Sequence, residues 1–348
     1  VHQYTSQADA LHLRHPVIAY WMGDGPNLGA LSRDWLRIGL AMAMISTIAL
    51  PNHIFSRPND ETLTIISFLD VGQGSATLLE LPTGVKVLVD GGGSSSPSFD
   101  PGAQLIAPFL WHRSIDRLDS LVISHQHLDH YNGLEFIINN FRPREIWVNG
   151  ESGAAEYLAL LKRAEESGSA IRVPEHGSII ATGGKARLTT IGNLHLRKDE
   201  ELSINNRSLV VKLESGGRKI ILAGDAMGSD GQRLVDQGMN LSSDVLLAPH
   251  HGSRYSAGYQ LVRAGSPDWL IVSASPFQSD KYPDPEFAEW CRQRGTKVLD
   301  TARFGTQTFT IDGNGKLNWQ AVSEKGRERL EHNRSRDKPP RIGQSLNR

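Results

Sequence analysis

The stretch SHQHLDHYNG at residues 124–133 constrains this chain most, because it gathers three histidines and an aspartate. It follows directly after the apolar run LDSLVIS, which has the composition of a β-strand. In an extended segment, residues two apart share a face, so His125, His127 and Asp129 face one way. His130 then points elsewhere. The first two histidines can hold one metal, and Asp129 and His130 can reach a second one nearby.

Two further apolar runs also end in metal-binding side chains. KIILAGD ends in Asp225, whose carboxylate can bridge two metals, and DVLLAPHHGS ends in the adjacent pair His250 and His251. Loops at the ends of strands are where folds commonly build their sites. Three strand ends that each deliver His or Asp therefore predict one convergent site for one or two divalent metal ions, zinc or manganese. Either histidine of the pair remains a candidate ligand.

Glycine-rich turns after two other strands are expected to line this site. FLDVGQG places Asp70 and Gln73 beside glycines that allow a positive φ, and VLVDGGG places Asp90 before three glycines. Asp70 is expected to bond backbone groups or a ligating histidine, and Asp90 to support the ligands from behind. Neither Ser75 nor Ser253 lies in a G-x-S-x-G elbow, so metal-dependent hydrolysis is favoured over serine-based hydrolysis.

Composition limits the remaining function classes. The formal net charge is -1, so no overall field directs the chain to nucleic acid or to a membrane surface. Cys291 is the only cysteine, which excludes an internal disulfide and a cysteine-based zinc finger. Histidines, of which the chain has 13, and aspartates are therefore the expected metal ligands.

The N-terminal part differs in pattern from the rest. Residues 35–50 carry no charge from Ile38 to Leu50, a run shorter than a typical bilayer-crossing helix. A buried helix, a signal-peptide core and the last helix of a membrane region are the interpretations that remain. Segment 51–60 has the composition of a linker. We assign residues 1–60 to a remnant of a membrane region and its linker, and expect a fragment because the chain opens with Val.

Residues 61–320 carry the pattern of one folded domain. Short Val- and Ile-rich runs come first as a meander and then alternate with stretches whose apolar residues recur at three and four. This order favours an α/β fold with helices packed outside a sheet. Residues 321–348 contain eight Lys and Arg against four Asp and Glu, without apolar periodicity, so we expect a basic, disordered tail.

The motifs together resemble a known family. HxHxDH after a strand, then Gly-Asp and a later histidine, resembles the metallo-β-lactamase-fold hydrolases. More narrowly, LDVGQG, LVDGGG, SHQHLDHYNGLE, NNRSLVVKL, LAGD and APHHGS resemble the C-terminal domain of the ComEC/Rec2 family of DNA-uptake channels, over about residues 61–315. The resemblance implies a four-layer αβ/βα sandwich with the site at one edge between two sheets. It also implies a nuclease that degrades the non-transported DNA strand during natural transformation.

The chain departs from the family pattern at two ligand positions. Asn205 and Asn206 stand where many superfamily members have a metal-binding histidine, so the first metal is expected to be held less completely. Asp284 stands where the family commonly has another histidine. Its carboxylate is a candidate ligand for the second metal, as carboxylates suit hard ions such as manganese. Ser75 stands where an aspartate is usual.

These residues have the following expected roles. The predicted metal ligands are His125, His127, Asp129, His130, Asp225 and Asp284. The predicted supporting or substrate-binding residues are Asp70, Gln73, Asp90, Asn205, Asn206, Ser208, Ser253 and Arg254. As catalytic residues, Asp129 is expected to orient the attacking water, and His250 or His251 to donate a proton to the leaving oxygen. Arg254 is expected to contact a phosphate.

Two other functions fit the same motifs. One is a metallo-hydrolase of small esters, thioesters or lactams, since fold alone does not decide the substrate. The other is a degenerate, non-catalytic domain that binds DNA or supports a channel. The partners implied by the resemblance are DNA, the membrane channel portion of the same polypeptide and other DNA-uptake proteins. The implied location is the bacterial inner membrane, where Arg33 and Arg37 favour an extracytoplasmic side for this domain.

Overall fold

The structure is a computed structural model that describes residues 62–93, 99–150, 153–192, 203–275 and 281–322. The predictions for the apolar run 35–50 and for the basic tail beyond residue 322 therefore lie outside the described residues. Within the described ranges, no helix combines the length and the apolar character needed to cross a bilayer.

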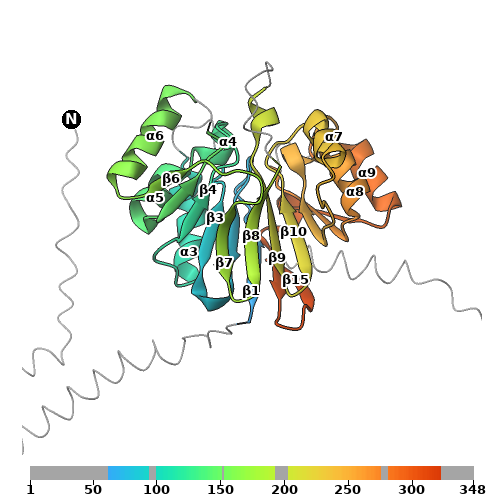
Figure 1. The fold of residues 1–348 in the computed structure, drawn as a ribbon, viewed down its shortest axis with the longest axis horizontal. Coiled ribbons are helices and arrows are strands. Elements are labelled where there is room, and N and C mark those ends of the chain that lie inside the picture. Colours follow the sequence, from blue (N-terminus) through green and yellow to red (C-terminus); the bar gives the residue numbers. More distant parts are fainter. Residues whose placement is uncertain (1–61, 94–98, 151–152, 193–202, 276–280, 323–348) are drawn as a thin grey trace, which may run out of the picture. The chain divides into compact units, whose positions relative to one another are not determined.

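The described strands form two mixed sheets, which Figure 1 shows between two sets of helices. The eight-stranded sheet has the order β15-β14-β1-β2-β3-β4-β5-β6, and the seven-stranded sheet has the order β13-β12-β11-β10-β9-β8-β7. The strands of the first sheet are β1 Thr64–Phe68, β2 Thr77–Glu80, β3 Lys86–Val89, β4 Ser120–Val122, β5 Glu145–Trp147, β6 Ala170–Arg172, β14 Gln307–Ile311 and β15 Leu317–Ala321. Those of the second are β7 Ile179–Gly183, β8 Ala186–Ile191, β9 Val210–Ser215, β10 Arg218–Leu222, β11 Val245–Leu247, β12 Trp269–Val272 and β13 Lys297–Asp300.

The helices divide between the two outer faces of the sheets (Figure 1). Those on the first sheet are α3 Ala107–His112, α5 Leu134–Phe141 and α6 Ala155–Glu166, and those on the second are α7 Gly228–Asp236, α8 Gly258–Gly265 and α9 Pro285–Gln293. The shorter elements are η2 Pro82–Gly84, η3 Gly102–Ile106, α4 Leu128–Tyr131, η5 Ile204–Arg207, η6 Pro249–Gly252 and α10 Thr301–Phe304.

Three apolar clusters hold these layers together. Alternate residues of one strand enter different clusters: in β2, Leu79 packs between the sheets and Leu78 packs under the helices of the first sheet. In β10, Ile220 packs between the sheets and Ile221 under the helices of the second. Strands covered on both faces read as continuous apolar runs, which is how these segments appear in the sequence. The α/β fold expected from the sequence, a four-layer αβ/βα sandwich, is confirmed.

The strand directions place the candidate residues. In the first sheet β3, β4, β5 and β6 run parallel, and in the second β10, β11, β12 and β13 do. In sheets of this kind, ligands bind outside the carboxyl ends of the parallel strands. Asp90 follows β3, His125 follows β4, Asp225 follows β10 and His251 follows β11. Parallel strands of both sheets thus deliver the polar residues that the sequence singles out.

Candidate metal centre

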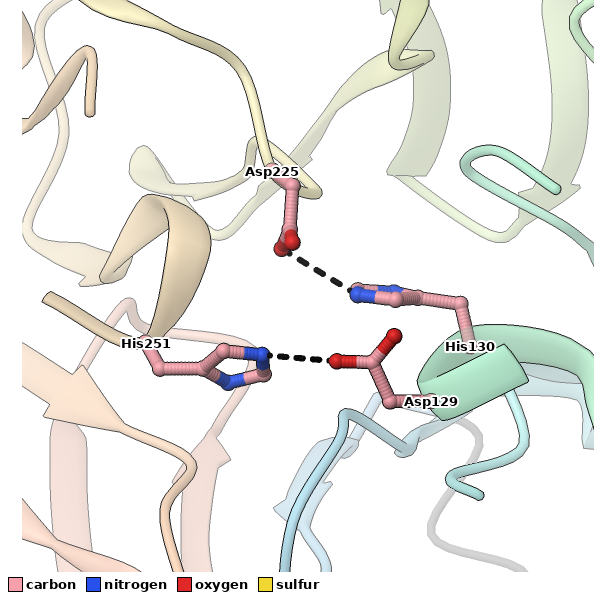
Figure 2. A group of neighbouring side chains, drawn as sticks. All are labelled: Asp129, His130, Asp225 and His251. Atoms are coloured by element: carbon pink, nitrogen blue, oxygen red, sulfur yellow. Dashed lines mark hydrogen bonds and ion pairs between the residues drawn. The ribbon is translucent and has the colours of Figure 1, made fainter. Parts of the chain in front are cut away.

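The first group of candidate ligands is drawn in Figure 2 and comprises Asp129, His130, Asp225 and His251. Each residue offers one ligand atom, and these atoms lie within 4.8 Å of one another. His130 Nε2 is 3.1 Å from Asp225 Oδ1, and His251 Nε2 is 3.1 Å from Asp129 Oδ2. Both histidines and Asp225 are buried, while Asp129 is partly exposed. Three of the four side chains are therefore enclosed by the protein, and solvent reaches the group at Asp129.

The second group comprises His125, His127 and Asp225. His125 Nε2 is 3.1 Å from His127 Nδ1 and 3.8 Å from Asp225 Oδ2. Asp225 belongs to both groups, and its two carboxylate oxygens face different histidines. A carboxylate in this position can bridge two metals, as the sequence suggests. Two metals held about 3.5–4 Å apart are a common arrangement in enzymes that hydrolyse phosphodiesters.

The protein holds the far nitrogen of two ligating rings. His130 Nδ1 lies 2.8 Å from Asp90 Oδ2, and His251 Nδ1 lies 2.9 Å from the carbonyl oxygen of Ser273. Both partners are acceptors, so each Nδ1 carries the hydrogen that it donates to them. A neutral imidazole then has its lone pair at Nε2, the atom that faces the cluster.

Ser124 extends the same arrangement to His125. Its hydroxyl donates to Asp90 Oδ2 at 2.9 Å and lies 3.0 Å from His125 Nδ1, from which it accepts. Its backbone N–H donates to Asp90 Oδ1 at 2.8 Å. Asp90 therefore supports two ligating histidines, one directly and one through Ser124, which agrees with its expected place behind the ligands.

This donor set fits a divalent cation. The lone pair of His130 Nε2 faces Asp225, and that of His251 Nε2 faces Asp129. Because a lone pair and a carboxylate oxygen repel each other, each of these two contacts needs a cation or a proton between its atoms. Without a cation, protons fill the role. Burial acts to lower the pKa of both histidines, but Asp225 and the other nearby carboxylates outweigh it and raise both values, that of His130 well above the usual range. A metal ion would replace these protons.

The remaining charges agree with this assignment. Burial and the neighbouring His130 hold the pKa of His125 well below its usual value, so this ring is neutral and able to ligate. Burial acts to raise the pKa of Asp225, but His130 and His251 lower it well below the usual carboxyl value. The Asp225 carboxylate is therefore ionised although it is buried.

Of the adjacent histidines, His251 lies within a ligand group and His250 lies beside one. His250 Nε2 is 3.8 Å from Asp225 Oδ2, and its side chain is 26% exposed against 4% for His251. Both residues have a positive φ, 49° and 55°, which non-glycine residues rarely adopt. Such strained backbone is characteristic of functional sites and persists where surrounding contacts hold it.

The structure does not bring Asp284 to either ligand group. Asp284 caps α9, accepting at Oδ1 from the backbone N–H of Phe287 at 3.0 Å. Its Oδ2 accepts from Arg254 Nε at 2.7 Å, so both oxygens are engaged. Arg254 also lies 3.6 Å from Glu286, which leaves its guanidinium between two carboxylates rather than directed at a phosphate. The expected metal and phosphate roles of these two residues therefore find no support in their placement.

The two asparagines lie close to the Asp225 loop in different ways. Asn206 Nδ2 donates to Asp230 Oδ2 at 2.9 Å and thereby ties η5 to the start of α7. Asn205 Nδ2 contacts Met227 Sδ at 3.9 Å. Ser208, expected to support the site, accepts from the backbone N–H of Asp225 at 3.1 Å and so orients this residue.

The two glycine-rich turns pack directly on the backbone of α4. A Cβ on Gly74 would lie 2.2 Å from the carbonyl oxygen of Asp129, and one on Gly93 would lie 2.0 Å from that of Leu128. Only glycine permits this approach. The Ser75 N–H donates to the Asp129 carbonyl at 3.1 Å, and the Gly91 N–H to that of His130 at 2.7 Å. Both turns thus hold the segment that carries two ligands.

The other predicted supporting residues play local roles. Asp70 Oδ1 accepts from the backbone N–H of Gly72 at 3.4 Å within its own turn. Burial and the nearby Asp300 raise its pKa. Gln73 Oε1 is buried and has no hydrogen-bond partner among the described residues. Ser253 accepts at Oγ from the backbone N–H of Tyr255 at 3.3 Å, which shapes the turn after the adjacent histidines.

Two serines with clear roles were not singled out from the sequence. Ser124 links Asp90 to His125, and the carbonyl of Ser273 holds His251, while its hydroxyl donates to the carbonyl of Gly74 at 2.7 Å. Both serines directly follow the apolar end of a parallel strand. That position, the same one that marks the ligands, was the signal that could have found them.

The family model described as metallo-beta-lactamase superfamily matches residues 69–274. The chain is 27% identical over 253 residues to ComE operon protein 3 of Bacillus subtilis, covering 69% of this chain and 32% of that protein. It is 24% identical over 282 residues to competence protein ComA of Neisseria gonorrhoeae (80% and 37%). It is 27% identical over 241 residues to recombination protein 2 of Haemophilus influenzae (69% and 28%).

The chain thus spans about a third of the length of these curated relatives. Among solved structures, the metallo-beta-lactamase fold protein YhfI of Bacillus subtilis is similar with a TM-score of 0.43 and 11% identity, covering 68% of this chain and 95% of that one. The resemblance to ComEC-type competence proteins is confirmed by the curated relatives, and the chain belongs to the metallo-beta-lactamase superfamily.

Proposed function

We propose that this chain is the metal-dependent nuclease domain of a DNA-uptake protein, and that it hydrolyses phosphodiester bonds of the DNA strand that is not transported. The observation that carries the proposal is the sharing of Asp225 between two ligand groups. Paired metal sites of this kind suit an in-line displacement at phosphorus, because both the attacking and the leaving oxygen need charge stabilisation.

The residues of the site divide the work. His125, His127 and Asp225 would hold one ion, and Asp129, His130, Asp225 and His251 would hold the other. When bound, such ions make water more acidic and neutralise charge on phosphoryl oxygens. Asp129 is the partly exposed carboxylate of the cluster, and it can orient the attacking water by accepting a hydrogen bond from it.

His250 is the better candidate for moving a proton to the leaving oxygen. It stands beside Asp225 at 3.8 Å, is partly exposed and belongs to neither ligand group, whereas His251 has both ring nitrogens engaged. Burial lowers the pKa of His250, so its ring is neutral in the metal-free chain. The partly exposed ring can take up a proton from solvent and pass it to the leaving oxygen.

The biological setting is proposed from the relatives. The names of two of them, competence protein ComA and recombination protein 2, refer to competence or recombination, and all three relatives are about three times as long as the matched segment. We propose that this domain is attached to a channel portion of the same polypeptide in the bacterial inner membrane, and that it lies on the extracytoplasmic side, which Arg33 and Arg37 favour. DNA and other uptake proteins are its proposed partners.

The test is a cleavage assay on the purified chain with single- and double-stranded linear DNA, after dialysis to remove metal and addition of Mn²⁺ or Zn²⁺. Cleavage should depend on the metal, stop with a chelator and fall sharply in Asp129→Ala. No cleavage with any metal, or equal cleavage by the variant, would contradict a nuclease. Less than one metal per chain after reloading would favour a degenerate domain instead.

A further inference from the structure

Tyr282 lies against the adjacent histidines of the candidate metal centre. Its ring centroid is 6.4 Å from that of His250 and 5.8 Å from that of His251. The side chain is partly exposed. An aromatic surface therefore stands next to the reacting groups, and the proposed chemistry makes no use of it.

The position of this ring is set by contacts on both sides. Tyr282 packs against the apolar cluster beneath the helices of the second sheet. The next residue, Pro283, packs so closely on Gly252 that a Cβ on the glycine would lie 2.8 Å from the Pro283 Cβ. The Asp284 N–H donates to the carbonyl of Gly252 at 2.9 Å. The segment that carries Tyr282 is thus attached to η6, which carries His250 and His251.

The charged groups near Tyr282 favour recognition of a ligand by ring stacking rather than by an ion pair with a phosphate. The neighbouring guanidinium, Arg254, is engaged by Asp284 at 2.7 Å and by Glu286 at 3.6 Å. These two carboxylates offset the positive charge of the guanidinium, which weakens its attraction for a phosphate. An aromatic ring held in place offers a flat apolar face at a small cost in side-chain entropy, and such faces bind nucleobases by stacking.

We propose that Tyr282 stacks on the nucleobase next to the phosphate that is cleaved, and that the site consequently takes an unpaired strand as its substrate. In a duplex both faces of each base are covered by its neighbours, so a tyrosine can reach a base face only where the base is unstacked. The inference rests on the proposed nuclease function and adds to it the substrate class and the residue that recognises it.

The test compares a single-stranded oligonucleotide with an oligonucleotide of equal length built from abasic units, using the full chain with Mn²⁺. Wild type should have a kcat/KM for the base-bearing strand roughly ten-fold above that for the abasic strand, the range expected for one stacked base. Tyr282→Phe, which keeps the ring and loses the hydroxyl, should preserve this ratio. Tyr282→Ala should bring the ratio close to one, because it loses the stacking contact that favours the base-bearing strand.

Other outcomes separate the two proposals. If Tyr282→Ala keeps the wild-type ratio, or loses activity equally on both strands, the ring does not recognise a base and the inference is overturned. Metal content measured on each variant shows whether His251 still binds its ion. If Tyr282→Phe behaves like Tyr282→Ala, the hydroxyl rather than the ring carries the effect, which also overturns stacking. If wild type cleaves neither strand but cleaves double-stranded DNA, the inference of an unpaired substrate is overturned. If it cleaves no DNA of either kind, the nuclease proposal itself fails.

Discussion

Asp90 accepts a hydrogen bond from His130 Nδ1 at 2.8 Å, although the two residues are 40 positions apart in the chain. The same carboxylate accepts both hydrogen bonds of Ser124, the residue that precedes His125. One side chain after β3 therefore orients the loop after β4 and the rings that it carries. Asp90 has a φ of 60°, so the turn that places it is itself strained.

Asp90→Asn should weaken metal binding while the fold remains intact, since asparagine also tolerates a positive φ. The amide lowers the basicity of His130 and disturbs its ring orientation. Losses of this kind typically reduce metal affinity by about 10- to 100-fold. Competition with a coloured chelator measures the affinity, and the exposed Asp236→Asn on α7 serves as the matched control. Equal affinities in the two variants would rule out the supporting role.

Asp225→Asn should remove metal from both sites, because Asp225 is common to the two ligand groups. His127→Ala should affect one site only, since His127 belongs to the second group alone. Metal analysis after dialysis should therefore find a lower metal content per chain in Asp225→Asn than in His127→Ala. Activity should fall by more than about 100-fold in Asp225→Asn, beyond the effect of a supporting residue. If both variants retain the same metal content, Asp225 does not bridge.

The adjacent histidines provide a matched pair. His251→Ala should lose metal, because Nε2 of His251 is one of the clustered ligand atoms and its Nδ1 is held by Ser273. His250→Ala should keep the wild-type metal content and lower kcat, since its ring stands outside both groups. Metal analysis and steady-state kinetics on the same preparations check this. The opposite pattern would exchange the roles that we assign to the two residues.

The sequence was sufficient to predict the three segments that carry the candidate metal ligands, because each of them follows a predicted strand. SHQHLDH, LAGD and APHHGS each follow a buried apolar run, and parallel strands bring their carboxyl ends to one edge. The four-layer arrangement followed from the resemblance, and the strand and helix patterns agreed with it. The structure brings six predicted or candidate ligands into two groups: His125, His127, Asp129, His130, Asp225 and His251.

Asp284 shows where the sequence was ambiguous. An aspartate before Pro285 is the pattern of a helix N-cap followed by proline at the first helical position, and this is the role that Asp284 has. The same residue type also suits a metal, and only the fold decides between the two. The contact between Ser273 and His251 could not be predicted from the sequence either. It is made by the backbone carbonyl of Ser273, which every residue type has.

Metal binding should strengthen as the pH rises, because Asp225 and Asp90 raise the pKa of the candidate ligand His130. Burial lowers the pKa of His130, but Asp225 and Asp90 outweigh it and raise the value well above the usual one, so the metal-free chain holds this proton at neutral pH. A metal must displace the proton, and its apparent affinity should therefore rise between about pH 6 and about pH 8. Titrations at several pH values, with released protons measured by a pH indicator, check this. No proton release at neutral pH would contradict it.

The same shift predicts an opposite trend for stability without metal. Because the folded pKa of His130 is raised, its contribution to stability is fully present below the unfolded pKa of about 6.5 and is lost as the pH rises through the folded value. The metal-free chain should therefore unfold at a lower temperature as the pH increases above about 6.5. The metal-loaded chain should not follow this trend, since the metal takes the place of the proton.

Asp284→Ala should destabilise the chain without removing metal. The variant loses the side-chain cap of α9, which typically costs about 1 kcal/mol in the free energy of unfolding. Asp284→Ser is the matched control, because serine also caps helices but supplies no carboxylate. We expect Asp284→Ser to recover most of the lost stability in urea unfolding, and both variants to retain the wild-type metal content. If Asp284 were a metal ligand, both variants would lose metal to a similar extent, and restoring the cap would not restore it.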